Sequence, residues 1–309
     1  MNTQSNAMYD ASVDAHRAAP AVLSPTRPFY WAVRRELWEN RSIYLAPLGV
    51  AAVFLFGFAI STIHLPAKMR SLSALDPAQQ QAAITMPYNL IAGLMMATGL
   101  IVGVFYSLDA LQGERRDRSI LFWKSLPVSD VVTVLSKACI PIVVLPLLAF
   151  AVTVATQWLM LLLSSLVLAG SRLSVAALWA QVSFFQTSLL LLYHLVTVHA
   201  IWHAPIYAWL LLVSAWARRG AFLWAALPVL AIMGLEKVVF HTSYFAELLG
   251  NRFGGGAEAM TMPGTLPMNP MTHLTPGNYL TSAGLWIGIA LTAAFLAGAI
   301  RLRRYRGPM

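Results

Sequence analysis

Charged residues are scarce in this chain of 309 residues: lysine, arginine, aspartate and glutamate together make up 11% of it, whereas 58% is hydrophobic. A soluble globular protein needs more polar residues than this to cover its surface, so that class is excluded. Several apolar runs are long enough to cross a hydrocarbon core of roughly 30 Å. The sequence therefore predicts a polytopic membrane protein of the all-α class.

Cysteine is nearly absent as well. The single Cys139 excludes a disulfide framework or a cysteine-based metal site within one chain, and it is interpreted as a small packed side chain. Residues 1–26 contain no apolar core of the kind a signal peptide needs, so we expect a disordered cytoplasmic tail there. Residues 27–306 are expected to form one transmembrane domain.

Catalytic signatures are missing too. The sequence has no Gly-x-x-x-x-Gly-Lys-Ser/Thr loop, no His-Glu-x-x-His and no Gly-x-Ser-x-Gly. We therefore expect that the chain is not an enzyme and cannot hydrolyse ATP alone. The net charge of +9 does not indicate a nucleic-acid partner, because most of the basic residues flank apolar runs, where they set topology.

Six spans are predicted, with boundaries good to a few residues. They are Ile43–Ile63, Met86–Leu108, Val131–Leu159, Phe184–Ala215, Ala221–Phe240 and Tyr279–Ile300. The third and fourth exceed the ~20 residues that a bilayer requires, so we expect them to tilt or to continue beyond it. With both termini in the cytoplasm, most of the 21 lysine and arginine residues fall on the cytoplasmic side, as the positive-inside rule requires.

Proline and glycine mark special points within these spans. Pro141 and Pro146 in the third span and Pro205 in the fourth each remove a backbone hydrogen bond, which favours kinks. Gly99 and Gly103 have the four-residue spacing that allows close helix packing, more often within one chain than between copies.

The segment before the first span combines aromatic and basic residues at helical spacing. An interfacial helix fits this pattern, because aromatic rings sit at headgroup level and arginines face anionic lipid. A simple extension of the first span remains the alternative. The residues concerned are Phe29, Tyr30, Trp31, Arg34, Arg35, Trp38 and Arg41.

The segment Asp109–Asp130 is a charged stretch between two apolar runs. Five consecutive charges occupy Glu114–Arg118, and Ile120, Trp123 and Leu126 then recur at a spacing of three. This pattern predicts a short helix under the membrane, followed by Ser129 or Asp130 as the cap of the next span. Such a helix, joined to two spans, would act as a lever for a soluble partner. A plain solvated loop is the alternative.

The residues of this segment resemble a family. Glu114-Arg115, Arg118-Ser119-Ile120-Leu121, Lys124-Ser125-Leu126-Pro127-Val128-Ser129 and the later Lys137 are similar to the cytoplasmic segment of ABC type-two exporter permeases. In that family the segment runs roughly Glu-Arg, Thr-Leu, then Leu-x-Ser-Pro-Val-Ser and a later Lys. This chain departs mildly, with Ser-Ile-Leu in place of Thr-Leu and with Ser preceding Leu-Pro-Val-Ser. The resemblance extends over most of Pro28–Arg306.

The resemblance implies a coupling helix that rests on a separate ABC ATP-binding subunit, which would bind ATP and Mg²⁺; no cofactor is expected in this chain itself. It further implies a second permease copy or a related permease, surrounding membrane lipids and a bacterial inner membrane. The residues that would contact the ATP-binding subunit are Glu114, Arg115, Arg118, Ser119, Leu121, Trp123, Leu126 and Pro127.

Polar residues inside the spans are further candidates, because a charge within a bilayer is costly. Glu236 and Lys237 interrupt the fifth span, either as a gate or as the wet end of a short span. His199 and His203 are four residues apart and share a helix face, whereas His194 points elsewhere, so three histidine ligands on one helix are excluded geometrically.

Residues 241–278 are expected to form an external loop with a short helix. Three functions compete on this sequence. They are a permease of an ATP-driven exporter, a membrane anchor or signalling subunit without transport, and a haem or metal protein that uses His199 and His203.

Overall fold

The structure is a computed structural model that describes residues 26–72, 74–125, 128–254 and 276–305. Of the tail expected at residues 1–26, residues 1–25 lie outside the described residues, as do Leu126, Pro127 and residues 255–275, whereas Thr26 begins the first described helix. The described part is almost entirely helical and contains no strand. Six of its helical stretches are long and apolar enough to cross a membrane, which confirms the prediction of an all-α multi-pass membrane protein. These stretches are Ser42–Leu72, Pro77–Arg116, Asp130–Gly170, Val175–Trp202, Ala221–Phe240 and Ala283–Tyr305.

The stretches are built from shorter elements. An N-terminal helix, α2 (Thr26–Glu39), precedes them. The first three stretches contain α3 (Ser42–Ser61), η1 (Thr62–His64), α4 (Leu65–Leu72), α5 (Pro77–Asp109), α6 (Gln112–Arg116), α8 (Asp130–Cys139), the π-helical η2 (Ile140–Val144) and α9 (Leu145–Gly170), with α7 (Ser119–Ser125) lying between the second and the third. The remainder is α10 (Val175–Val182), α11 (Phe184–His194), the π-helical η3 (Leu195–Trp202), α12 (Ala204–Trp216), α13 (Ala221–Leu235), the π-helical η4 (Glu236–Phe240), α14 (Tyr244–Phe253), α15 (Pro276–Thr281) and α16 (Ala283–Tyr305).

The fourth span differs most from its predicted bounds. The prediction was one helix over Phe184–Ala215, but the structure starts the apolar stretch at Val175 and divides it after Trp202. Pro205 lies in the first turn of α12, where its missing N–H costs nothing. The chain therefore unwinds into η3 before the proline instead of kinking around it. The fifth span, Ala221–Phe240, has the predicted bounds.

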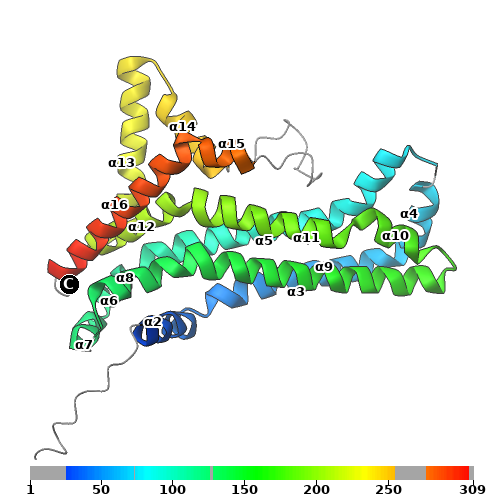
Figure 1. Ribbon diagram of the computed structural model, residues 1–309, viewed down its shortest axis with the longest axis horizontal. Coiled ribbons are helices and arrows are strands. Elements are labelled where there is room, and N and C mark those ends of the chain that lie inside the picture. The colour runs from blue at the N-terminus through cyan, green and yellow to red at the C-terminus, as the bar shows by residue number, and fades with distance from the viewer. Residues whose placement is uncertain (1–25, 73, 126–127, 255–275, 306–309) are drawn as a thin grey trace, which may run out of the picture.

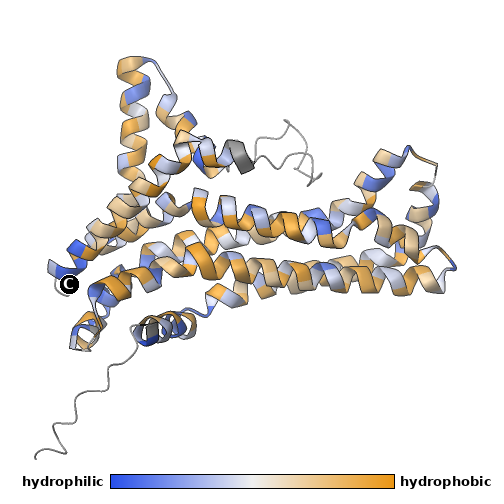
Figure 2. Ribbon diagram, in the orientation of Figure 1, coloured by the Kyte–Doolittle hydropathy of each residue, from blue (hydrophilic) through white to orange (hydrophobic). Residues whose placement is uncertain are grey.

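The long helices α3, α5 and α9 pack together and run along the horizontal axis of Figure 1. Their shared core includes Ile91, Met95, Met160 and Leu161, all fully or almost fully buried. Hydrophobic residues cover the long helices in Figure 2, and hydrophilic ones gather toward the ends. This distribution is typical of helices that cross a bilayer.

The C-terminal helices form a second layer. Helix α16 packs along α12 in the same direction, because Gly284 lies against Trp202 at one end and Gly298 against Leu212 further along. Helix α13 diverges from the bundle in Figure 1 and is exposed along almost its whole length. The bundle is thus compact around α5, α9 and α12 and open beside α13.

Candidate functional site

Helices α6 and α7 lie at the end of the bundle where α2 and the C-terminal end of α16 also lie (Figure 1). The chain turns sharply between α6 and α7 at Arg118, whose φ of 58° is in the left-handed region. Beyond α7, the Ser129 side chain accepts a hydrogen bond of 3.2 Å from the Val132 amide and caps α8. The predicted cap is thereby confirmed at Ser129.

A buried charge cluster lies under α6. It consists of Glu36 from α2, Glu114 from α6, Lys137 from α8 and Arg303 from α16, which are between 2% and 7% exposed. The Lys137 ammonium is 2.7 Å from a carboxylate oxygen of Glu36 and 3.2 Å from one of Glu114. The Arg303 guanidinium donates to the other oxygen of Glu114. Two carboxylates therefore face two cations, and Glu114 joins both cations.

Partners at the edge of the cluster satisfy the remaining polar atoms. The Tyr106 hydroxyl donates to Glu36 over 2.7 Å, and Arg303 Nε donates to Asp130 over 3.1 Å. Arg35 reaches Glu114 at 3.4 Å. Buried ions are tolerated only with such pairing, because an unpaired charge in a low-dielectric interior costs several kcal/mol.

Arg35 is also part of a surface pair with Glu39, at 2.7 Å. Burial lowers the pKa of Arg35, but the hydrogen bond to Glu39 and the nearby carboxylates Glu36, Glu39 and Glu114 outweigh it, so the pKa is raised above its ordinary value. The guanidinium therefore keeps its charge next to the cluster.

A second set of contacts fixes α6 to the end of α12. The Ser214 hydroxyl accepts hydrogen bonds from the Leu111 and Gln112 amides at 3.0 and 2.9 Å. Arg115 donates to the Ala215 carbonyl over 2.7 Å and thereby caps the last turn of α12. Since the cluster holds α6 to α2, α8 and α16, this short helix is connected to four others. A force on α6 would reach all of them.

The predicted contact residues therefore fall into separate groups. Glu114 and Arg115 are buried against the other helices of this chain. Arg118 is exposed, Ser119 is half-buried and Leu121 is 58% exposed. Trp123 belongs to α7, but its side chain, like Leu126 and Pro127, is outside the described residues.

Helix α7 exposes two apolar side chains beside the polar Lys124 and Ser125. Leu121 and Phe122 are 58% and 60% exposed, whereas Ile120 between α7 and the bundle is buried. The Lys124 ammonium lies 3.5 Å from the Arg304 carbonyl and ties α7 to the end of α16. Helix α7 thus exposes hydrophobic side chains next to helices that the charge cluster holds together.

Sequence reasoning missed the partners of Glu114 within the chain. Lys137 was assigned to the cytoplasmic basic residues and to the family-like segment, and Arg303 to the cytoplasmic basic residues alone, whereas Glu36 received no role. The signal available was their position: each lies on an apolar helix face near the membrane boundary, where a lone charge needs a partner.

Of the two candidate gate residues, Glu236 has a local structural role. The Glu236 carboxylate accepts hydrogen bonds from the Thr242 hydroxyl at 3.0 Å and from the Phe245 amide at 2.9 Å, at the start of α14. Lys237 is exposed. Glu236 therefore organises the turn between η4 and α14.

His199 and His203 lie close together, with ring centroids 5.2 Å apart. His203 Nε2 is 3.2 Å from the Phe253 carbonyl. Among the described residues no group of three His, Cys, Asp or Glu side chains is placed to hold a metal. The arrangement offers at most these two imidazoles to a metal or haem.

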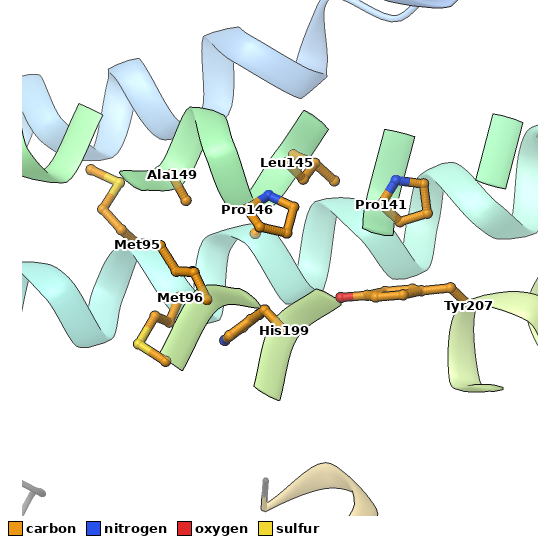
Figure 3. Close-up of a pocket in the computed structure, with 10 residues that line it drawn as sticks. Met95, Met96, Pro141, Leu145, Pro146, Ala149, His199 and Tyr207 are labelled. Carbon is orange, nitrogen blue, oxygen red and sulfur yellow. The ribbon is translucent and has the colours of Figure 1, made fainter. Parts of the chain in front are cut away.

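Figure 3 shows His199 and Tyr207 directed toward one small pocket in the middle of the bundle. The pocket has no room for a water molecule. It lies beside the π-helical segments η2 and η3. Its other lining residues are Met95, Met96, Gly99, Pro141, Leu145, Pro146, Ala149 and Leu195.

Gly103 gives Tyr207 its place. A Cβ atom at this glycine would be 2.9 Å from Tyr207 Cε1 and 3.4 Å from the Pro141 side chain. We expect Gly103→Ala to lower the free energy of unfolding by about 1–3 kcal/mol, because the ring must move. Thermal unfolding in detergent measures this. Gly99→Ala is the matched control, one turn away, because its added methyl meets nothing within 4 Å beyond its chain neighbours and its own helix backbone; equal losses in both variants would contradict the explanation.

The chain matches no protein-family model, no curated protein and no solved structure. What it does must therefore be inferred from its own geometry, above all from the charge cluster and from α7.

Proposed function

We propose that the chain is the permease half of an ATP-driven exporter, coupled through α6 and α7 to a separate ABC ATP-binding subunit. One observation carries the proposal. A short helix that exposes Leu121 and Phe122 continues from α6, and Glu114 of α6 is paired with charged residues of three other helices, α2, α8 and α16. Exposed apolar surface at the polar end of a bundle is typical of a protein interface.

The charge cluster supplies the mechanical link in this proposal. The ATP-binding subunit, which holds ATP and Mg²⁺, grips α7 and moves it as its nucleotide state changes. Glu114 transmits the movement to α8 and α16, and Arg115 transmits it to α12. The mechanism requires only that the ATP-binding subunit binds α7 with different affinities in its two nucleotide states. In this arrangement Glu114 and Arg115 act as positioning residues, and α7 makes the direct contact.

The proposal also fixes the surroundings of the chain. It places α2, α6, α7 and both termini on the cytoplasmic side of a bacterial inner membrane, with α2 in the interface. The Arg34 guanidinium stacks 5.1 and 4.7 Å from the rings of Trp31 and Trp38, a grouping suited to headgroup depth. A second permease copy or a related permease completes the pathway.

Affinity purification of the tagged chain from its native membrane in mild detergent tests the proposal. A stoichiometric ATP-binding protein in the eluate is expected, and ATP-driven efflux after reconstitution of the two proteins. Co-purification without ATP-driven flux would favour the anchor or signalling subunit. No ATP-binding protein at all would overturn the proposal, and an absorption spectrum of the purified chain would then test for haem.

A further inference from the structure

A groove opens where α5 ends and α13 begins. Its volume is about 630 Å³, within the range of ligand sites. The chain reverses into α13 at Gly220, whose φ is 62°, and this turn forms one wall. We refer to it as the basic groove. Its lining residues are Phe105, Leu108, Asp109, Gln112, Arg116, Arg218, Arg219, Gly220, Ala221 and Phe222.

The charge of the groove is positive. Arg116, Arg218 and Arg219 line it, and Asp109 is the single acidic residue in the lining. Asp109 is already occupied by Arg116, at 3.3 Å. Arg218 and Arg219 are exposed, and neither forms an ion pair within the described part of the chain. The guanidinium groups of Arg218 and Arg219 therefore line the groove, and their N–H donors are available to a ligand.

The other part of the groove is apolar. Phe105 on α5 and Phe222 on α13 are 64% and 63% exposed, and both helices continue from here as membrane-crossing stretches. A ligand in this groove would meet arginines at one end and aromatic rings toward the membrane at the other. That pattern matches an amphiphile whose anionic headgroup lies at the bilayer surface.

The N-terminal end of α13 is held in place by contacts with α12, so the groove is preformed. Trp209 on α12 donates to the Ala225 carbonyl at 3.3 Å. The rings of Trp216 and Trp224 meet edge to face with centroids 4.7 Å apart. These contacts attach α13 to α12 on one side and leave its other side facing α5.

We propose that the basic groove binds the phosphate headgroup of an anionic membrane lipid, with Arg218 and Arg219 as the phosphate ligands and Phe105 and Phe222 against its chains. Guanidinium groups suit this task because two parallel N–H bonds match two phosphate oxygens. The site goes beyond the proposed function, because it binds lipid whether or not an ATP-binding subunit is present.

Native mass spectrometry of the full chain in detergent, titrated with dioleoyl phosphatidylglycerol or dioleoyl phosphatidylcholine, tests the proposal. The wild-type protein is expected to bind phosphatidylglycerol at least about tenfold more tightly, and the double variant Arg218→Gln/Arg219→Gln to lose this preference. Phe222→Ala is expected to weaken phosphatidylglycerol binding with the arginines intact. Thermal unfolding should be unchanged in both variants, since the altered side chains are exposed.

The matched control is Arg301→Gln/Arg304→Gln, which removes the same two charges from exposed positions of α16 outside the groove. An equal loss in this control would reduce the effect to general electrostatics and overturn the site. Glycerol 3-phosphate tests the other source of a phosphate group. If it competes as well as the lipid does, the groove takes a soluble phosphate ester and the lipid assignment is wrong.

Discussion

Replacement of Glu114 by alanine is expected to lower the free energy of unfolding by about 3–5 kcal/mol, the largest effect of any single substitution considered for this chain. The carboxylate faces both Lys137 and Arg303, so its removal leaves two buried cations with too little negative charge. Thermal unfolding in detergent, followed by circular dichroism, measures the loss.

Glu39→Gln is the matched control. Glu39 also pairs with an arginine, Arg35, but its side chain is half exposed. Water screens such a pair, so we expect a change of less than about 1 kcal/mol. Similar losses in Glu114→Ala and Glu39→Gln would show that burial does not set the strength of these pairs.

A double-mutant cycle places the effect within the cluster. Lys137→Met alone leaves Glu36 and Glu114 buried without their shared cation, whereas Lys137→Met combined with Glu36→Gln also removes one of the charges left behind. The double variant is expected to be less destabilised than the sum of the two single variants. Additive losses would contradict a direct Glu36–Lys137 interaction.

The second large effect concerns partner binding. Leu121→Asp/Phe122→Asp is expected to reduce binding of the proposed ATP-binding subunit at least about tenfold, because it puts two charges into an apolar contact that must be desolvated. Both side chains are more than half exposed, so the stability of the chain itself should change little. Co-purification and ATPase stimulation measure the loss.

Leu248→Asp on α14 provides the control for this experiment. Leu248 is 63% exposed, similar to Phe122, but lies on a helix that the proposal leaves without a partner. Loss of the ATP-binding subunit in this variant as well would indicate a general defect of the protein. Retention in the Leu121/Phe122 variant would exclude α7 as the docking helix.

The two predictions distinguish Glu114, which positions α6, from the residues of α7 that contact the partner. Glu114→Ala is expected to impair both stability and coupling, since α6 loses its attachment to α8 and α16. The α7 variant is expected to impair coupling alone. A protein in which both variants remain stable and coupled would not use the α6–α7 segment as its link.

Local sequence was sufficient for much of the fold. Residues Ala221–Phe240 form a membrane-length helical stretch with the predicted bounds, because a run that follows a glycine and is apolar up to Leu235 has one favourable structure in a bilayer, with the charges of Glu236 and Lys237 only near its end. The cap at Ser129 follows from the same kind of local chemistry. The fourth span was less predictable, because Pro205 is compatible with either a kinked helix or a new helix start, and neighbouring helices decide between them.

The candidate site was predictable only in its location. Composition placed an isolated charged segment between the second and third spans, since charges in an apolar chain must leave the hydrocarbon or find partners. Whether a given charge is solvated or buried with a partner depends on the tertiary structure. Arg118 faces outward. Glu114, four residues earlier, is buried next to Lys137 and Arg303, which lie 23 and 189 positions further along the sequence.

The sequence by itself therefore determined that this is a helical membrane protein with six spans and a polar segment after the second of them, because the hydrophobic effect and backbone hydrogen bonding act along the chain. Only the tertiary structure decided that Glu36, Glu114, Lys137 and Arg303 meet in one place. Their pairing depends on the directions in which α2, α6, α8 and α16 approach one another. Those directions come from side-chain packing between distant segments, which no local pattern encodes.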